Sequence, residues 1–353
     1  MRITNTGLLF DDPQRSTPGY ILLCPVDGDR AMLLRPDGSL AQSWQTGRGM
    51  TNWSYLLPNG NLFRNERCEN RQGVALTVSG RLSEYAPDGT LLWRHDDPFQ
   101  HHDARRLADG AVYAAFTDIP TDVKAGIRGG LAGTQTPGGP FGEVIRQVDD
   151  AGQVQWEWHF TDHLMDRFAL YPNSNKWSYG HTNTVCPLID GTYLISSKNL
   201  NLIFILDPQS GVAWDYQNDE MSGQHDAQML DNGNILVFAN GVYQSDLHHS
   251  QVLEIDLKTK EIVWRYTAKD DFTSFFSPHM GGAQRLPSGN TLICEGNKGC
   301  LFEVTPEHEV VREYVSPFFV HSQTFGKINW LFRARWYAAD AQEIKALERS
   351  VAL

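Results

Sequence analysis

One short segment, Gln224–Val237 (QHDAQMLDNGNILV), recurs along the chain and constrains the fold more than any other feature. A histidine and an aspartate precede a short apolar run, an Asp-Asn-Gly-Asn turn follows, and a second β-rich run leaves the turn. Asn-Gly supplies the positive φ angles that two-residue hairpin turns require, so the segment predicts a β-hairpin. Copies stand at His101–Phe116, Gly180–Ser196 and His279–Glu295, and Thr51–Glu66 carries the hairpin without the histidine.

A second pair of strand-like runs follows each hairpin and ends near a tryptophan or tyrosine, as in LSEYAPDGTLLWRH at Leu82–His95. Further pairs stand at Val144–Phe160, Leu202–Gln217, Val252–Thr267 and Leu301–Val315, and Tyr20–Trp44 opens the chain with the same pattern. The pattern predicts six units of roughly 40 to 60 residues with four strands each, a period typical of β-propellers. We therefore predict an all-β, six-bladed β-propeller, with seven blades as the alternative.

The predicted organisation is a single propeller domain over residues 1–338, followed by a short C-terminal helix at 339–353. The helix is expected because this tail is rich in Ala, Glu, Lys and Leu and lacks turn formers. Two insertions, 117–142 and 161–179, are longer than propeller loops need to be and are interpreted as lid-like. The innermost strand of the first unit is expected from Thr6–Asp12 or from the tail around His321–Lys327.

Charge and composition limit the classes of partner. The formal net charge of −12 and the lack of a basic patch argue against nucleic acid and against an anionic membrane surface. The N-terminus lacks the pattern of a secretory signal, and no apolar run is long enough to span a membrane, so we expect a cytoplasmic protein. The five cysteines are an odd number in a chain large enough to need no disulfides. The oligomeric state stays open.

Four histidines occupy matching positions in the repeats. His102 and His225 stand eight residues before the turn glycine of their hairpins, and His181 and His279 stand ten residues before theirs. In a propeller the first strand of each blade lines the central channel, so these imidazoles are expected to share one pocket. They are the predicted catalytic residues.

Other polar and aromatic residues are expected at the same mouth of the channel, because they end second strands or lie in loops on that face. Asp103 and Asp226 either orient the imidazoles or stabilise the turn that leads into the strand. The predicted substrate-binding residues are Lys198, Lys298, Arg64, Asp226, Asp103, Tyr179, Trp177, Trp53, Phe276 and His321. The expected substrate is a small aromatic or anionic molecule.

The chain resembles the arylsulfotransferase-like (arylsulfate sulfotransferase) β-propellers. The resemblance lies in the opening PGYILL and AMLLRPDGSLAQSW, the repeated HDA-x-x-L-x-x-G hairpins, and the closing NWLFRARWYAAD at Asn329–Asp340. It implies sulfuryl transfer between phenols through a sulfohistidine, because imidazole is a good nucleophile and a nearby cation neutralises the sulfate oxygens. The resemblance makes His225 the expected nucleophile, with His279 as its alternative. The family's sulfate-binding arginine corresponds here to Lys198, or to Lys298 in the other register.

Two other functions stay open at this point. Converging neutral imidazoles could hold Fe, Cu, Zn or Mn, so His102, His181, His225 and His279 could serve a metal-dependent lyase, hydrolase or oxygenase. No cofactor other than such a divalent metal is indicated. The chain could instead be a propeller that binds a partner without catalysis.

Overall fold

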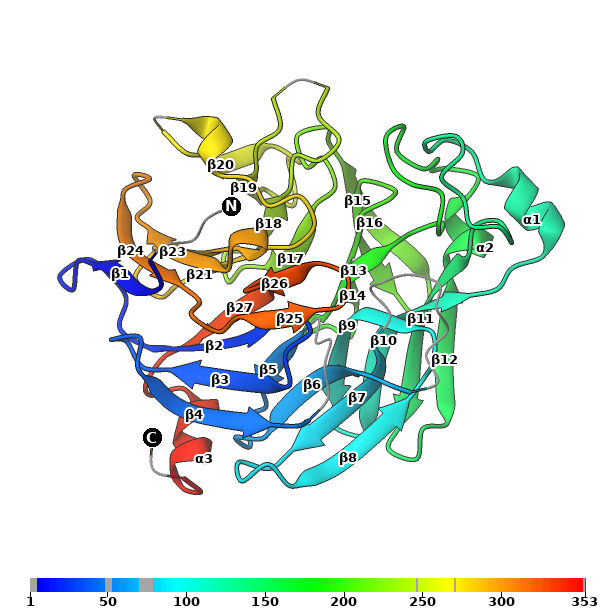
Figure 1. Cartoon of the computed structure of the whole chain (residues 1–353). Coiled ribbons are helices and arrows are strands. Elements are labelled where there is room, and N and C mark those ends of the chain that lie inside the picture. Colours follow the sequence, from blue (N-terminus) through cyan, green and yellow to red (C-terminus); the bar gives the residue numbers. More distant parts are fainter. Residues whose placement is uncertain (1–4, 48–52, 70–78, 246, 270, 352) are drawn as a thin grey trace. The chain divides into compact units, whose positions relative to one another are not determined.

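The computed structural model describes residues 5–47, 53–69, 79–245, 247–269, 271–351 and 353. Within these ranges the strands form six sheets of four or five strands and one two-stranded ribbon (Figure 1). The chain is a six-bladed β-propeller, as the period of the hairpins predicts. The first two residues of the hairpin at Thr51–Glu66 lie outside the described residues.

The chain divides into two compact units. Unit 1 comprises Met1–Arg67, Leu82–His95 and Ser277–Leu353, and unit 2 comprises Cys68–Arg81 and Asp96–Phe276. Each unit has its own clusters of buried apolar side chains. The single domain expected from the sequence stays a prediction.

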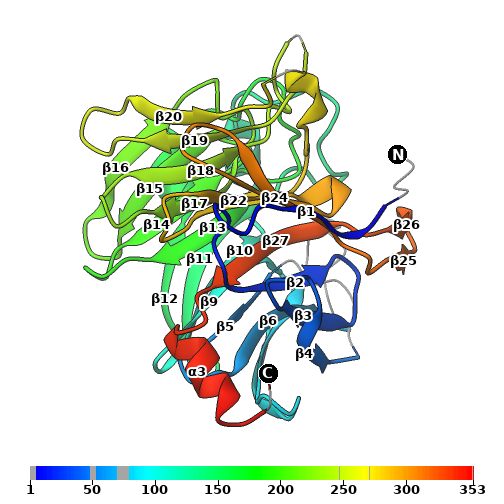
Figure 2. The same cartoon turned by 90° about the vertical axis from the view of Figure 1, so that its left-hand side faces the viewer.

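Unit 2 contains three four-stranded sheets, each built in chain order. The first consists of β9 (Gln100–Leu107), β10 (Gly110–Thr117), β11 (Gly142–Asp149) and β12 (Val154–His159). The second consists of β13 (Thr182–Pro187), β14 (Tyr193–Ser197), β15 (Leu202–Asp207) and β16 (Gly211–Gln217). The third consists of β17 (His225–Met229), β18 (Ile235–Ala239), β19 (Gln251–Ile255) and β20 (Ile262–Tyr266), and Figure 2 shows it beside the second sheet.

Unit 1 contains the other three sheets. One consists of β5 (Ser54–Leu56), β6 (Leu62–Arg67), β7 (Gly80–Tyr85) and β8 (Leu91–Asp96), of which Gly80, Arg81 and Asp96 fall in unit 2. Another consists of β21 (Gly282–Arg285), β22 (Thr291–Glu295), β23 (Cys300–Val304), β24 (Val310–Val315) and the added outer strand β1 (Gly7–Asp11). The last has the order β27 (Leu331–Tyr337), β2 (Tyr20–Pro25), β3 (Arg30–Leu34) and β4 (Leu40–Gln45).

The first strand of this last sheet comes from neither segment that the sequence suggested. β27 pairs antiparallel with β2, whereas β1 pairs with β24 and the tail segment forms the ribbon β25 (Val320–Ser322) and β26 (Gly326–Ile328). Burial explains the difference. Leu331 and Trp336 of β27 are buried in a core cluster, whereas Leu9 and Phe10 of β1 are exposed.

Four of the repeated hairpins have turns of one geometry, whereas the β9–β10 turn pairs Leu107 with Gly110 across a two-residue loop. In the β17–β18 turn, Gly233 N–H donates to Leu230 O, Leu230 N–H donates to Asn234 O, and Gly233 has a φ of 85°. The turns at Gly60, Gly191 and Gly289 have equivalent bonds and positive φ angles. These are three-residue loops that need one left-handed glycine, rather than the two-residue loops suggested by Asn-Gly.

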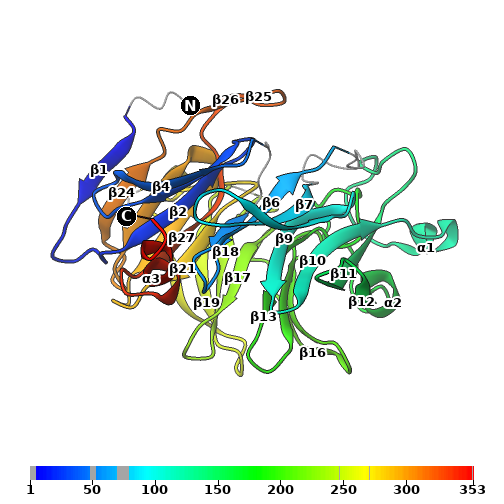
Figure 3. The same cartoon turned by 90° about the horizontal axis from the view of Figure 1, so that it is seen from below.

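The two insertions are joined to each other through their backbones. Segment 118–141 carries helix α1 (Thr121–Gly126), and helix α2 (Phe160–Leu164) precedes the rest of the second insertion (Figure 3). Gly129 forms a parallel bridge with Leu170, and Phe141 forms one with Ser178. This pairing was not predicted, because no local pattern in the sequence indicates it.

The C-terminal helix is confirmed as α3 (Gln342–Glu348), shorter than the predicted segment. Its Ile344 and Leu347 are buried in a cluster with Trp44 and Leu56 of unit 1. Among the described residues, no helix is both long and apolar enough to cross a membrane.

Candidate active site

The first strands of the three sheets in unit 2, β9, β13 and β17, lie next to one another. Each strand has an irregular register near its beginning, at His102–Asp103, Asn183 and Asp226–Ala227. His102, His181 and Asp226 adopt positive φ angles of 53°, 58° and 54°. Bulges of this kind redirect side chains, and they are common beside active sites.

Three of the four predicted catalytic histidines belong to one buried cluster. The ring centroids of His102 and His181 lie 4.5 Å apart in an edge-to-face arrangement. His225 and Lys198 both lower the pKa of His102 through their charge, which places them in the same neighbourhood. The side chains of His102, His181, His225 and Lys198 are all buried. The fold therefore brings together residues that the sequence pattern had singled out.

Burial disfavours the protonated forms of the basic side chains in this cluster. Desolvation is the largest cause that holds the pKa of His102 well below its usual range, followed by the charges of His181, His101, His225 and Lys198. His102 is therefore neutral near pH 7, as a nucleophile or base must be. Burial also lowers the pKa of Lys198 to about 8, so its amine is mostly protonated near pH 7.

Lys198 is covered by aromatic side chains. Its ammonium group lies 5.9 Å from the ring centroid of Tyr243, within the range of a cation–π contact. Tyr243 stacks on Tyr171 of the second insertion, with centroids 5.2 Å apart. Nδ2 of Asn199, the residue after Lys198, donates to Ser178 O in the same insertion. The second insertion therefore covers the segment that carries Lys198.

Glu143 is a member of the site that the sequence analysis missed. Its Oε2 accepts the backbone N–H of His181 at 2.8 Å, and its Oε1 accepts that of Thr182 at 2.6 Å. Oε1 also lies 2.9 Å from Nε2 of His101, although this contact departs from ideal hydrogen-bond alignment. Glu143 opens the apolar run of β11 directly after a glycine-rich segment, which is the one signal that could have identified it.

His101, the other missed residue, connects Glu143 to His102. Its Nδ1 lies 2.7 Å from Nδ1 of His102, and its ring stacks on Phe116 with centroids 3.9 Å apart. The sequence displays this residue as the first half of a His-His doublet, but only the second half matched the repeat.

The two aspartates next to the predicted histidines make contacts to other groups. Asp103 accepts a hydrogen bond from Val185 N–H on the neighbouring strand β13, and its other oxygen accepts from Arg105. Asp226 accepts from Nε2 of Gln228. His225 instead has an amide partner, because its Nδ1 lies 2.7 Å from Oδ1 of Asn240.

The predicted site residues of unit 1 have different surroundings. His279 is exposed in a bend before β21, with its backbone N–H donating to Oδ1 of Asn297. Lys298 pairs with Glu295 at 2.5 Å, and the buried Arg64 pairs with Glu66 at 3.2 Å. His321 is an exposed residue of β25. Their roles in substrate binding or catalysis stay predictions.

The predicted aromatic contacts are also dispersed. Tyr179 is buried in a core cluster of unit 2 and its hydroxyl donates to Phe168 O, while Trp177 is partly exposed. Phe276 stacks on His248. In unit 1, Trp53 lies under the guanidinium of Arg333.

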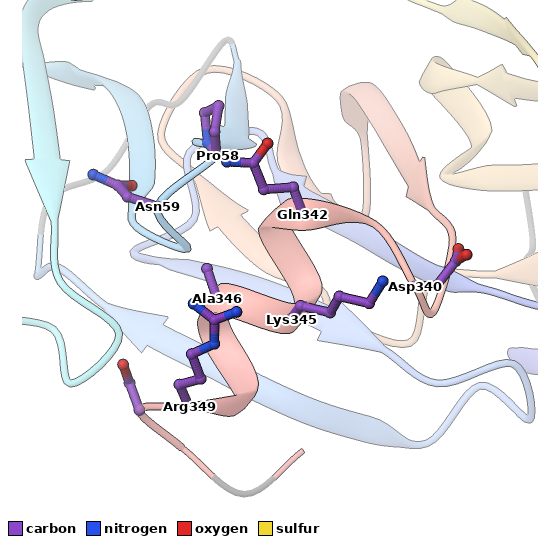
Figure 4. Close-up of a pocket in the computed structure, with 8 residues that line it drawn as sticks. Pro58, Asn59, Asp340, Gln342, Lys345, Ala346 and Arg349 are labelled. Atoms are coloured by element: carbon purple, nitrogen blue, oxygen red, sulfur yellow. The ribbon is translucent and has the colours of Figure 1, made fainter.

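Three surface cavities lie elsewhere. The first, of about 590 Å³, lies between α3 and the turn at Pro58–Asn59, and α3 together with the residues just before and after it forms most of the wall (Figure 4). The others measure about 690 Å³ in unit 2, beside Arg265 and Phe272, and about 400 Å³ in unit 1, beside Pro25 and Phe318. None of the three includes a residue of the histidine cluster. In the described part of the chain, no three His, Cys, Asp or Glu side chains are grouped so that they could hold a metal ion.

Fold and site together define a six-bladed β-propeller with a buried histidine cluster. Residues 141–316, which include Glu143, His181, Lys198 and His225, match the family model described as arylsulfotransferase (ASST). This match and the six-bladed fold support an arylsulfotransferase-like family of β-propellers. No curated protein matches it significantly.

Solved structures are similar in fold. A protein of unknown function from Bacteroides caccae is 15% identical, with 90% of this chain and 98% of its own covered and a TM-score of 0.57. A streptogramin B lyase is 9% identical over 96% of both chains with a TM-score of 0.51. The WD40 propeller domain of Doa1 is 10% identical over 97% of this chain and 96% of its own, with a TM-score of 0.50. At these identities the likeness concerns the fold.

Proposed function

We propose that the chain is an enzyme that transfers a sulfuryl group from an aryl sulfate to a phenol through a histidine of the unit 2 cluster. The observation that carries the proposal is the burial of His102, His181, His225 and Lys198 together, in a chain whose matched family is the arylsulfotransferases. A neutral imidazole supplies the nucleophile, and the Lys198 ammonium neutralises the sulfate oxygens.

The chemistry of the cluster suits a small anion. Charge on buried groups is strongly disfavoured, and the lowered pKa of Lys198 shows how poorly its ammonium is solvated here. An anionic sulfate beside Lys198 relieves this unfavourable burial. Lysine offers a point charge rather than the bidentate fork of arginine, so orientation of the sulfate depends on the surrounding imidazoles.

Access requires movement, because the cluster is buried beneath the second insertion. The joined insertions are the segments whose displacement would uncover Lys198, which is the lid role expected from their length. The aromatic rings of Tyr171 and Tyr243 then provide a surface for the phenolic ring of the substrate.

The test uses 4-nitrophenyl sulfate as donor and a panel of phenols as acceptors. We expect release of 4-nitrophenol that depends on acceptor, and a fall of at least about 10³-fold in His102→Gln. His95→Gln, a partly exposed histidine on β8, is the matched control and should keep full activity. Absence of release from the wild-type protein with every acceptor would contradict the proposal.

A further inference from the structure

The acceptor role of Glu143 determines where the proton of His101 lies. Each carboxyl oxygen of Glu143 already accepts a backbone N–H, from His181 or from Thr182. The carboxyl group is therefore an acceptor toward its neighbours. A proton on Nε2 of His101, 2.9 Å from such an oxygen, avoids the repulsion of two lone pairs, although the angle of this contact lies outside that of a hydrogen bond. The contact favours the tautomer of His101 that carries its proton on Nε2.

The tautomer of His101 in turn determines that of His102. With its proton on Nε2, neutral His101 has an acceptor at Nδ1, and this atom lies 2.7 Å from Nδ1 of His102. One proton lies between the two nitrogens, and it belongs to His102. The neutral ring of His102 then has its lone pair on Nε2.

We propose that Glu143 and His101 form a relay that makes Nε2 of His102 the nucleophilic atom of the transfer. This inference rests on the proposed function and deepens it by naming the atom. Glu143 and His101 are positioning residues, because they act through His102. Stacking of His101 on Phe116 holds the relay in one orientation.

His225 is the competing nucleophile, and its partner distinguishes it. Nδ1 of His225 donates to the amide oxygen of Asn240, which also leaves a lone pair on Nε2. However, an imidazole that attacks sulfur acquires positive charge, and a neutral amide stabilises that charge less than a carboxylate reached through a second imidazole. The relay therefore favours His102 over His225 as the residue that carries the sulfuryl group.

In the first half-reaction, a bond forms between Nε2 of His102 and sulfur, and the bond between sulfur and the aryl oxygen breaks. The aryloxide leaves with the electron pair and takes a proton from the Lys198 ammonium. The Nδ1 proton of the sulfated ring is shared with His101, whose Nε2–H faces Glu143. In the second half-reaction the acceptor phenol attacks sulfur, its proton passes to Lys198, and the electron pair of the broken N–S bond returns to Nε2.

The first experiment identifies the labelled residue. Wild-type protein is mixed with 4-nitrophenyl sulfate without acceptor, digested at alkaline pH, and its peptides are analysed by mass spectrometry. We expect the sulfuryl group on the peptide that contains His102. Release of 4-nitrophenol with the label on His225 overturns the relay but keeps the proposed function, whereas no release overturns both.

The second experiment separates positioning from structural support. Glu143→Gln should lower kcat by about 10²-fold with little change in KM, because the neutral amide cannot stabilise the positive charge that the two imidazoles acquire during the transfer. Glu303→Gln is the matched control: Glu303 is also buried and accepts the backbone N–H of Thr17 at 2.7 Å. It should lose stability but keep kcat, and an equal loss of kcat in both variants contradicts the relay.

A third measurement reads the tautomer directly. In protein labelled with ¹⁵N-histidine, long-range ¹H–¹⁵N spectra distinguish Nδ1–H from Nε2–H rings, and His102→Gln assigns the signal. We expect His102 to be Nδ1–H in the wild type. A wild-type His102 protonated at Nε2 overturns the relay, whatever the activity.

Discussion

The Nδ1 atoms of His101 and His102 lie 2.7 Å apart, at the centre of a contact chain that begins at the buried carboxyl group of Glu143. Both histidines belong to β9, and Glu143 belongs to β11 of the same sheet. The doublet is therefore held within one blade. Its neighbour His181 is bound to the same carboxyl group through its backbone, which connects two blades of unit 2.

Acid should destabilise the protein through His102. Its pKa is well below the ordinary value of 6.5, so the unfolded chain takes up a proton at this position before the folded one does. The free energy of unfolding is unaffected above about pH 6.5 and should fall by up to about 1.4 kcal/mol per pH unit below it. Urea titrations between pH 7.5 and 5 measure this slope. His102→Gln should reduce the slope and His95→Gln should not; identical slopes in all three proteins would contradict the assignment.

Replacing Lys198 by methionine should stabilise the fold near neutral pH. The pKa of Lys198 is about 8 against an ordinary 10.5, so burial of its ammonium costs about 3 kcal/mol below pH 8. The cost disappears as the pH rises from about 8 to 10.5, because the unfolded chain alone then binds the proton. Lys198→Met should therefore be more stable than the wild type at pH 7 and lose this advantage near pH 10.5. Chemical unfolding at both pH values checks the sign; a variant less stable at pH 7 would refute it.

Activity should have an alkaline limit set by Lys198. If its ammonium binds the sulfate, kcat/KM for 4-nitrophenyl sulfate should fall about tenfold per pH unit above pH 8. Lys198→Arg should be less active at pH 7, but its profile should stay flat to higher pH because guanidinium remains charged. This donor is chosen because 4-nitrophenolate is a good leaving group, so its departure depends little on proton transfer from Lys198. An unchanged limit in Lys198→Arg would assign the titration to another group.

The junction of the two insertions can be tested at Gly129. A Cβ at this position would lie 2.1 Å from Leu170 O, and its φ of 73° is left-handed. Gly129→Ala should therefore break the bridge, destabilise the protein by about 2 kcal/mol or more, and expose the insertions to limited proteolysis. The matched control is Gly133→Ala, which has a φ of 80° but open space around its Cβ, so it should lose only about 1 kcal/mol. Equal protease sensitivity of the two variants would show that the bridge does not hold the insertions.

Local sequence patterns predict most of the fold. The turn glycines, the strand alternation and the recurring period predict six four-stranded blades, and the Ala- and Glu-rich tail predicts α3. These features can be predicted from the sequence because turn conformation and strand alternation depend on residues that are close in sequence. The choice of β27 to begin the last sheet depends instead on how much apolar surface competing segments bury, so the sequence prediction of this strand was wrong.

The sequence by itself determined that histidines recur at two registers of the hairpins, and three of them do share a cluster in unit 2. Only the tertiary structure decided their partners. Glu143 lies 42 residues after His101 in the sequence, and a strand register with a bulge at His102–Asp103 brings the carboxyl group to the ring. The repeats determine the fold of each blade. The side-chain contacts depend on local departures from the repeat, which here are the bulge in β9, the positive φ of His102 and the carboxylate of Glu143.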